Sequence, residues 1–249
     1  MNNSQKVIAI IPVRLESSRL PRKALKDICG LPMIVHVFKR CLLSKKLDMV
    51  YVATDSLEVK EVVEIHGGNV IMTSSKHQTG TDRIAEAAID LDADIVVNIQ
   101  GDEALVNPNY IDKVVNELIE NPEINVGILV NSFNKKNSPS DIKVVLNNNN
   151  DVMYLSRSDI PSDSRANNLP MLKAYHIVPF RKKFLLEFSY WDKSFLEEIE
   201  FNEYLRILEY GEIIRAVFVE SDAVSVDTSD DLKYVRREMP NDLWFPKYQ

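Results

Sequence analysis

Short β-branched runs alternate with amphipathic segments over the first 120 residues, and this alternation restricts the folds open to the chain. Four runs have the length and composition of buried strands: Lys6–Pro12, Asp48–Thr54, Asn69–Met72 and Asp94–Ile99. Apolar residues at helical spacing predict four helices, over Leu31–Leu43, Leu57–His66, Thr81–Leu91 and Asn109–Glu120. Strands and helices joined by short links are typical of βαβ units. The sequence therefore predicts an α/β fold with a mostly parallel sheet and helices on both faces.

The regular alternation of strands and helices ends near residue 125. The next strand-like runs, Asn125–Phe133, Ile142–Leu146 and Asp151–Leu155, have no long helices between them. We interpret residues 125–190 as an antiparallel extension at the sheet edge, within a single domain over residues 1–249. Helices are predicted over Phe195–Tyr210 and Ser229–Glu238. The aromatic and leucine residues of 184–210 are expected to form core or a subunit interface.

Composition narrows the class of protein. The 249 residues are 45% hydrophobic and 27% charged, which is ordinary for a soluble globular protein. The net charge of −7 argues against nucleic-acid binding, and no apolar run is long enough to cross a membrane. Cys29 and Cys41 form no disulfide framework or zinc spacing, and no signal-peptide pattern precedes the first strand. We expect a cytoplasmic enzyme.

Open parallel sheets bind ligands beyond the carboxyl ends of their strands, so the residues after each strand are the candidates. The first such place is the loop Arg14–Lys23. Four of its ten residues are basic, although the protein is acidic overall. Arginine forks and lysine point charges suit a triphosphate; the alternative is a solvated basic loop. The phosphate loop GxxxxGK[ST] and the motif GxGxxG are both absent.

Two acidic segments are candidates for metal binding. Asp102 follows a strand beside a glycine that lets the backbone approach closely, which is a sound place for Mg²⁺ or simply an acidic turn. Thr228 or Ser229 caps the last helix, with Asp230 and Asp231 at its positive end. Asp227 has no such role, and it would complete a metal pair if it folded back near Asp102.

A fourth segment, His77–Arg83, offers small and hydroxyl residues before a helix. They could present backbone donors to a nucleotide, or form a simple capping box with Thr81 as the cap. By contrast, the DxD pattern Asp92–Asp94 precedes its strand and lies at the wrong end of the sheet for a glycosyltransferase. We interpret it as a solvated turn. His36 and His66 are expected to be structural.

The four places together resemble the 3-deoxy-manno-octulosonate (Kdo) cytidylyltransferases, or CMP-Kdo synthetases. The similar segments run in order through nearly the whole chain: IIPVRLESSRLPRKAL, GLPMIVHV, YVATD, IMTSSKHQTGTDRIAEA, VNIQGDE, YLSRSDIP, LRILEYGE and VDTSDDLKYVR. The resemblance implies a Rossmann-like nucleotide-binding sheet of the nucleotide-diphospho-sugar transferase type, with an antiparallel dimerisation extension. It also implies a homodimer that takes CTP and an acidic sugar as substrates.

The resemblance also assigns roles to residues. Arg14, Arg19 and Lys23 match the phosphate-gripping basic positions, and Asp102 and Asp227 the two Mg²⁺ ligands; these five form the predicted catalytic set. The predicted nucleotide-binding residues are Pro12, Arg14, Ser17, Ser18, Arg19, Lys23, Ser74, Gly80, Gln100 and Asp102. The predicted substrate-binding residues are Arg157, beside the sugar carboxylate, with Tyr175, His176, Glu203 and Tyr204.

The implied reaction joins CTP and the sugar acid into a CMP-sugar with release of pyrophosphate. Departures from the family concentrate in the sugar pocket. Ala174 stands at the family's histidine, His176 at its glycine, Val178 at its tyrosine and Tyr204 at its glutamine. Ser74 replaces an arginine that many members carry. A polar pocket discriminates strongly, so these changes predict an altered acceptor: a Kdo variant such as 8-amino-Kdo, another acidic sugar, or a phosphonate. A non-catalytic nucleotide-binding paralogue is disfavoured, because the basic and acidic residues are retained.

Overall fold

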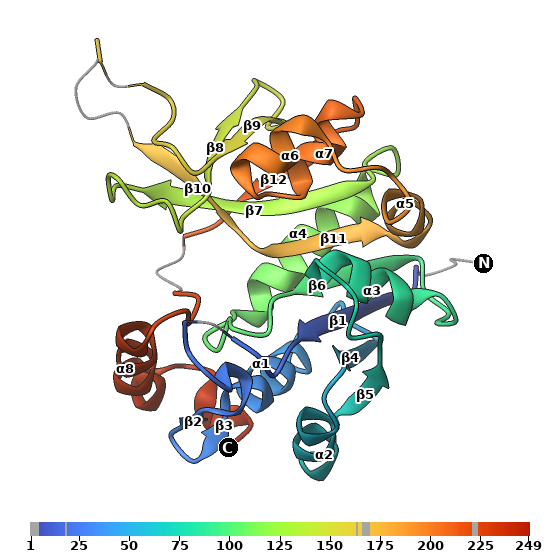
Figure 1. Ribbon diagram of the computed structural model, residues 1–249, viewed down its shortest axis with the longest axis vertical. Coiled ribbons are helices and arrows are strands. Elements are labelled where there is room, and N and C mark those ends of the chain that lie inside the picture. Colours follow the sequence, from blue (N-terminus) through green and yellow to red (C-terminus); the bar gives the residue numbers. More distant parts are fainter. Residues whose placement is uncertain (1–4, 18, 163, 166–169, 221–223) are drawn as a thin grey trace. The chain divides into compact units, whose positions relative to one another are not determined.

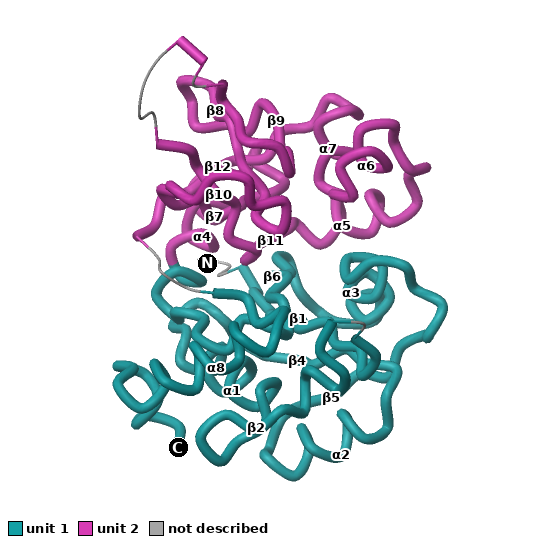
Figure 2. Tube along the Cα trace, turned by 60° about the vertical axis from the view of Figure 1, so that its left-hand side comes forward, with its two compact units in different colours: residues 1–112, 222–249 teal, residues 113–221 magenta. Residues whose placement is uncertain are grey.

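The computed structural model describes residues 5–17, 19–162, 164–165, 170–220 and 224–249 (Figure 1). The chain forms two compact units (Figure 2). Unit 1 consists of residues 1–112 and 222–249, and unit 2 of residues 113–221. The predicted extension over 125–190 falls within unit 2. The single domain over residues 1–249 stays a prediction.

Unit 1 contains a parallel sheet in the strand order β5-β4-β1-β6. The strands are β1 (Val7–Val13), β4 (Met49–Thr54), β5 (Asn69–Met72) and β6 (Ile95–Ile99). Every residue of β1 and β6 is buried, as their continuous β-branched runs predict. The helices are α1 (Met33–Cys41), α2 (Leu57–Ile65), α3 (Gly80–Ala88) and α8 (Ser229–Glu238), and α4 (Pro108–Glu120) follows β6 in the chain. Short elements complete the unit: η1 (Lys23–Leu25), the β2 (Asp27–Ile28) and β3 (Leu31–Pro32) hairpin, η2 (Met239–Asn241) and η3 (Phe245–Lys247).

Local chemistry sets the helix ends in unit 1. Ser56 caps α2, and the helix stops at the predicted glycines, where Gly67 has a φ of +81° and Gly68 N donates to Val63 O. The helix predicted from Leu31 instead begins at Met33, because Leu31 and Pro32 pair with β2.

A hydrophobic cluster separate from the sheet core holds the loops at the carboxyl ends of the strands. Leu20 from the basic loop, Ala104 from the turn after β6 and Val226 from the segment before α8 are buried together with residues of α1 and α8. These three contacts anchor the three segments that carry the predicted catalytic residues.

Unit 2 is built around β7 (Val126–Phe133), and its strands run in the order β11-β7-β10-β8-β9. β10 (Met171–Tyr175) and β11 (Ile177–Arg181) pair antiparallel to β7, and β12 (Ile214–Phe218) pairs parallel to it. β8 (Lys143–Leu146) and β9 (Val152–Ser156) form an antiparallel pair. The expected antiparallel pairing is therefore present, together with one parallel strand that was not expected.

The helix predicted over Phe195–Tyr210 is wrong as a single element. The segment instead forms α6 (Phe195–Glu200) and α7 (Tyr204–Glu209). A further helix, α5 (Lys182–Phe188), precedes them. α6 ends where Phe201 adopts a left-handed conformation with a φ of 48°, which no helical turn can continue.

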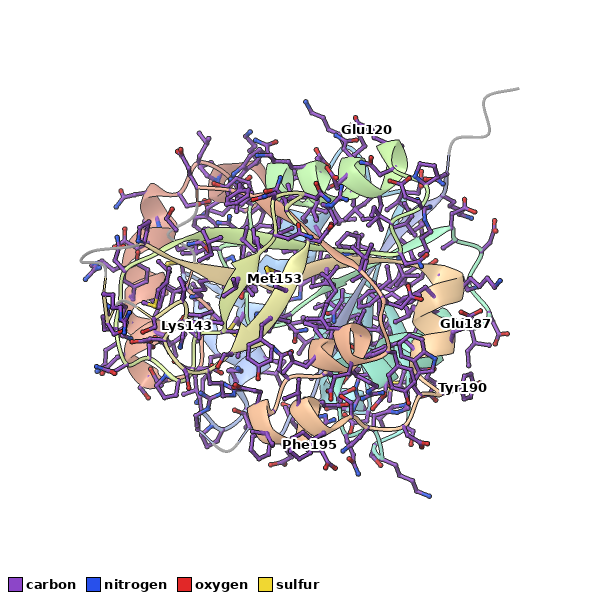
Figure 3. The ribbon with its side chains drawn as sticks, turned by 90° about the horizontal axis from the view of Figure 1, so that it is seen from above. Glu120, Lys143, Met153, Glu187, Tyr190 and Phe195 are labelled. Carbon is purple, nitrogen blue, oxygen red and sulfur yellow. The ribbon has the colours of Figure 1, made fainter. Side chains whose placement is uncertain are left out.

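The apolar residues of 184–210 divide between the two expected roles. Phe184, Phe188 and Tyr204 are buried core. Tyr190 and Phe195 are 84% and 71% exposed, and they lie at the periphery of the view in Figure 3. No helix in the described part of the chain is long and apolar enough to cross a membrane.

Candidate active site

Three segments distant in sequence meet at one ammonium group in unit 1. Lys23 Nζ donates to Asp102 Oδ2 over 2.7 Å and to Asp227 Oδ1 over 3.0 Å. Arg19 Nη2 lies 3.0 Å from the same Asp227 oxygen. The structure thus brings together four of the five predicted catalytic residues, and Asp227 folds back to Asp102 as expected.

Local structure explains why the two carboxylates converge. Gly101 passes so close to β1 that a Cβ there would lie 2.8 Å from Val13 Cγ2 and 3.1 Å from Pro12 O, so only glycine fits beside Asp102. On the other side, Val226 N donates to Asp102 O over 3.0 Å. This backbone bond joins the segment before α8 to the turn after β6 and sets Asp227 next to Asp102.

The ion cluster is partly shielded from solvent. The side chains of Lys23, Asp102 and Asp227 are 17%, 24% and 28% exposed. Burial alone lowers the pKa of Lys23, but the attraction of the two carboxylates outweighs burial and leaves that pKa above its usual value. Lys23 is therefore a charged ammonium at neutral pH.

The other basic residues of the loop have separate partners. Arg14 Nη2 donates to the backbone carbonyl of His77, which links the loop after β1 to the loop after β5. Arg22 pairs with Glu58 of α2. Ser17 is half-buried, and Ser18 lies outside the described residues.

Three predicted nucleotide-binding residues meet beside the start of α3. A Cβ on Gly80 would lie 3.3 Å from Pro12 Cγ and 3.9 Å from Gln100 Nε2. Gln100 is held in turn by Asn98, whose Oδ1 accepts from Gln100 Nε2 over 2.9 Å. Asn98 was missed as a positioning residue, and its signal was a single amide in an otherwise apolar strand.

The capping prediction for α3 is wrong by two residues. Thr79, not Thr81, is the cap: its side chain accepts from Asp82 N, and Asp82 accepts from Thr79 N. Thr81 is inside the helix and buried. For α8 the expected capping is confirmed, with Thr228 as the cap and Asp231 as its partner.

Ser74 lies in the loop between β5 and α3. Its backbone N donates to Glu86 Oε2 over 2.9 Å, and His77 pairs with the same carboxylate. Burial opposes ionisation of Glu86, but these two partners outweigh it and hold its pKa below the usual value. Glu86 thus holds in place the loop whose His77 carbonyl accepts a hydrogen bond from Arg14.

Glu103 is a structural neighbour of the site that sequence reasoning missed. It is 1% exposed and accepts a hydrogen bond from Ser225 Oγ, so it ties the two metal-candidate segments together a second time. The sequence motif QGDE does not indicate that Asp102 and Glu103 have different roles.

The donor set at Asp102 and Asp227 fits Mg²⁺. Two convergent carboxylates are what proteins offer this ion when substrate phosphates and water supply its other ligands. No group of three or more His, Cys, Asp or Glu in the described ranges is placed to hold a metal alone.

The rejected DxD pattern lies at the amino ends of the strands. Asp94 Oδ2 accepts from Lys6 N, before β1, and Asp92 pairs with Lys6 Nζ over 3.0 Å. These aspartates are therefore far along the strands from the carboxyl-end cluster.

The predicted substrate-binding residues all lie in unit 2. Arg157 Nε, Nη1 and Nη2 donate to the backbone carbonyls of Glu200, Pro139 and Phe201. This arginine therefore fixes the junction between α6 and α7, and its contact with a sugar carboxylate stays a prediction.

An aromatic stack occupies the segment that departs from the family. The rings of His176 and Tyr204 stack at 6.2 Å, and Phe180 packs against Tyr204 at 6.2 Å. Tyr175 and Tyr204 are buried, and Glu203 is half-buried at the start of α7. Aromatic surface thus stands where the resemblance places glycine and glutamine.

The fold is that of a nucleotidyltransferase-type α/β protein. A family model described as cytidylyltransferase matches residues 8–214. A solved structure of CMP:2-keto-3-deoxy-manno-octonic acid synthetase complexed with CTP superimposes with a TM-score of 0.92 at 37% identity, covering 96% of this chain and 100% of that one. The expected mostly parallel α/β fold is thereby confirmed.

Curated relatives define the family more narrowly. The 3-deoxy-manno-octulosonate cytidylyltransferase of Trichlorobacter lovleyi is 39% identical over 94% of this chain and 98% of its own length. The 8-amino-3,8-dideoxy-manno-octulosonate cytidylyltransferase of Shewanella frigidimarina is 37% identical over 92% and 96%. The chain belongs to the 3-deoxy-manno-octulosonate cytidylyltransferase family.

Proposed function

We propose that this protein transfers CMP from CTP to the anomeric hydroxyl of Kdo or a closely related 2-keto sugar acid, with release of pyrophosphate. The convergence of Lys23, Asp102 and Asp227 at the carboxyl ends of β1 and β6 carries the proposal. Cations and carboxylates in one partly shielded cluster suit a reaction in which phosphate charge moves.

The chemistry follows from positioning and charge. The sugar hydroxyl oxygen bonds to the α-phosphorus and gives up its proton to water, as the bond to pyrophosphate breaks in line and on the opposite side. Arg14, Arg19 and Lys23 would donate to the phosphate oxygens and stabilise the charge that develops on pyrophosphate. Asp102 and Asp227 would hold Mg²⁺, which when bound neutralises phosphate charge. Gln100 and Gly80 would flank the nucleotide.

A different acidic acceptor is the second candidate. The stack of His176 on Tyr204 favours it, because aromatic rings occupy positions that are glycine and glutamine in the family pattern. One relative acts, by its name, on 8-amino-3,8-dideoxy-manno-octulosonate. The acceptor would differ while the nucleotide chemistry stayed the same.

Pyrophosphate release tests both candidates. The purified protein, with CTP and Mg²⁺, is offered Kdo, 8-amino-Kdo, sialic-type acids and simple phosphonates in parallel. We expect release with Kdo or another 2-keto sugar acid, and a loss of about a hundredfold or more in Asp102→Asn and Asp227→Ala. Asp92→Asn, at the opposite ends of the strands, is the matched control and should retain activity. Release from no acceptor, or undiminished release in both site variants, would contradict the proposal.

A further inference from the structure

Lys23 occupies the position that a shared metal ion would need. Its Nζ lies 2.7 Å from Asp102 Oδ2 and 3.0 Å from Asp227 Oδ1. A Mg²⁺ ion bound to the same two oxygens would sit about 2 Å from each. An ammonium group and a metal ion cannot both lie between this pair of oxygens, so either one excludes the other.

The charge balance of the cluster points the same way. The two carboxylates are matched by the charges of Lys23 and Arg19, so the formal charge of these four side chains is zero. A neutral cluster attracts a divalent cation only weakly. A triphosphate brings negative charge and acceptor oxygens, to which the ammonium and the guanidinium can turn instead.

We propose that Lys23 is a resident cation that closes the Asp102–Asp227 pair to divalent metal until a nucleotide triphosphate draws the ammonium away. The inference rests on the proposed function in taking the two aspartates as metal ligands. It goes further in making metal and nucleotide binding interdependent: metal alone binds poorly, and the phosphates release the site.

The chain offers graded and matched comparisons for this role. Arg19 contacts only Asp227, and its side chain is 59% exposed, so its removal should open the pair less. Lys173 in unit 2 makes a comparable ion pair with Asp141, at 2.5 Å and with side chains 22% and 16% exposed. Its ion-pair partner is the single carboxylate of Asp141, and it has no predicted part in metal binding.

The test measures Mn²⁺ binding to the nucleotide-free protein by electron paramagnetic resonance of the free ion. We expect weak binding to the wild-type protein and about tenfold tighter binding to Lys23→Met, because one positive charge a few ångströms away has been removed. Lys23→Gln, which retains a hydrogen-bond donor without the charge, should show the same gain. Arg19→Gln should show a smaller gain, and Lys173→Met none.

A double variant and a thermal measurement locate the gained site. Lys23→Met combined with Asp227→Asn should lose the extra affinity. Mn²⁺ should also raise the melting temperature of Lys23→Met more than that of the wild-type protein, since the ion replaces the lost counter-charge. This second readout identifies any variant that has merely lost its fold.

Two results would overturn the inference: folded Lys23 variants that bind Mn²⁺ no more tightly than the wild-type protein, or a gain that survives Asp227→Asn. The proposed function is judged separately, by pyrophosphate release from the wild-type protein. Release without the Mn²⁺ effect would reject only the resident-cation role, and the Mn²⁺ effect without release from any acceptor would reject only the proposed reaction.

Discussion

Lys143 is a fully buried lysine whose ammonium group is surrounded by backbone oxygens of unit 2. Its Nζ donates to Ser138 O over 2.7 Å, to Asp141 O over 2.8 Å and to the carbonyl of Arg157. The Asp159 carboxylate lies 3.7 Å away and balances the charge. The Lys143 side chain therefore holds the segment before β8 against the turn after β9, which contains Arg157.

Replacing Lys143 by methionine should destabilise the protein by about 3 kcal/mol or more, because one buried and two partly buried carbonyl groups lose their donor and a carboxylate loses its counter-charge. Urea denaturation measures the free energy of unfolding. Lys183→Met is the matched control: its side chain is 91% exposed and makes only an i,i+4 pair, so it should change stability by less than about 0.5 kcal/mol. Equal stabilities of the two variants would show that the carbonyl contacts contribute little.

Single residues mark the limit of what the sequence could predict. Asp102 could be proposed from its place after a strand, and Asp227 because capping left it without a role. Their contact through Lys23 depends on the burial of Leu20, Ala104 and Val226 in one cluster, which no local pattern reveals. Lys143 was not singled out from the sequence, because a lysine in a strand-like run is usually exposed.

At the scale of elements, prediction succeeded where burial and period agreed. The four strands of unit 1 were placed within one residue at each end, and α8 was placed at its observed bounds. In unit 2, β7, β8 and β9 were also placed within one residue at each end, but β10 and β11 were not predicted. Pro179 interrupts the apolar run of β11 and argues against a strand there. Helix α6 ends at Phe201 because its backbone adopts a left-handed conformation, and a phenylalanine in the sequence does not predict that conformation.

The C-terminal segment is anchored to α1 through Tyr248. Its hydroxyl accepts from Arg40 Nε over 3.0 Å and lies 2.9 Å from His36 Nδ1. Arg40, which is fully buried, also pairs with Asp242 over 2.5 Å. Burial raises the pKa of Tyr248 to about 12, although Arg40 opposes that rise.

This raised pKa predicts a pH dependence of stability. The folded protein favours the neutral phenol, so the contribution of Tyr248 is complete below its unfolded pKa of about 10 and is lost as pH rises toward about 12. Between about pH 9 and about pH 11, the wild-type protein should lose about 1 kcal/mol relative to Tyr248→Phe. Urea denaturation of both proteins at the two pH values measures this difference. A constant difference would mean that the phenol is no harder to ionise in the folded state.

At the scale of the whole molecule, the predicted catalytic residues and most of the departures from the family pattern lie in different units. The predicted catalytic residues and the described members of the predicted nucleotide-binding set lie in unit 1. Four of the five departures from the family pattern, at residues 174, 176, 178 and 204, lie in unit 2, and Ser74 is the fifth. This distribution is what a change of acceptor with retained nucleotide chemistry would produce.

Exposed aromatic side chains also concentrate in unit 2. In the described part of the chain, Tyr190, Phe195, Phe201, Tyr210 and Phe218 are the exposed aromatic residues, and all belong to that unit. Exposed aromatic side chains that gather into one contiguous patch mark an interaction surface. Four of the five lie within residues 184–210, the segment expected to form core or a subunit interface, and Phe218 is the last residue of β12.

We therefore expect a homodimer, of twice the 28.5 kDa chain mass, that buries this aromatic surface. Phe195→Lys should shift sedimentation equilibrium toward the monomer and weaken dimerisation by about tenfold or more, because a charge would replace a buried aromatic contact. Leu243→Lys changes a residue of unit 1 that is 74% exposed, and it should leave the dimer intact. A monomeric wild-type protein would show that the dimer implied by the family resemblance does not extend to this chain. A dimer unaffected by Phe195→Lys would place the interface on another surface.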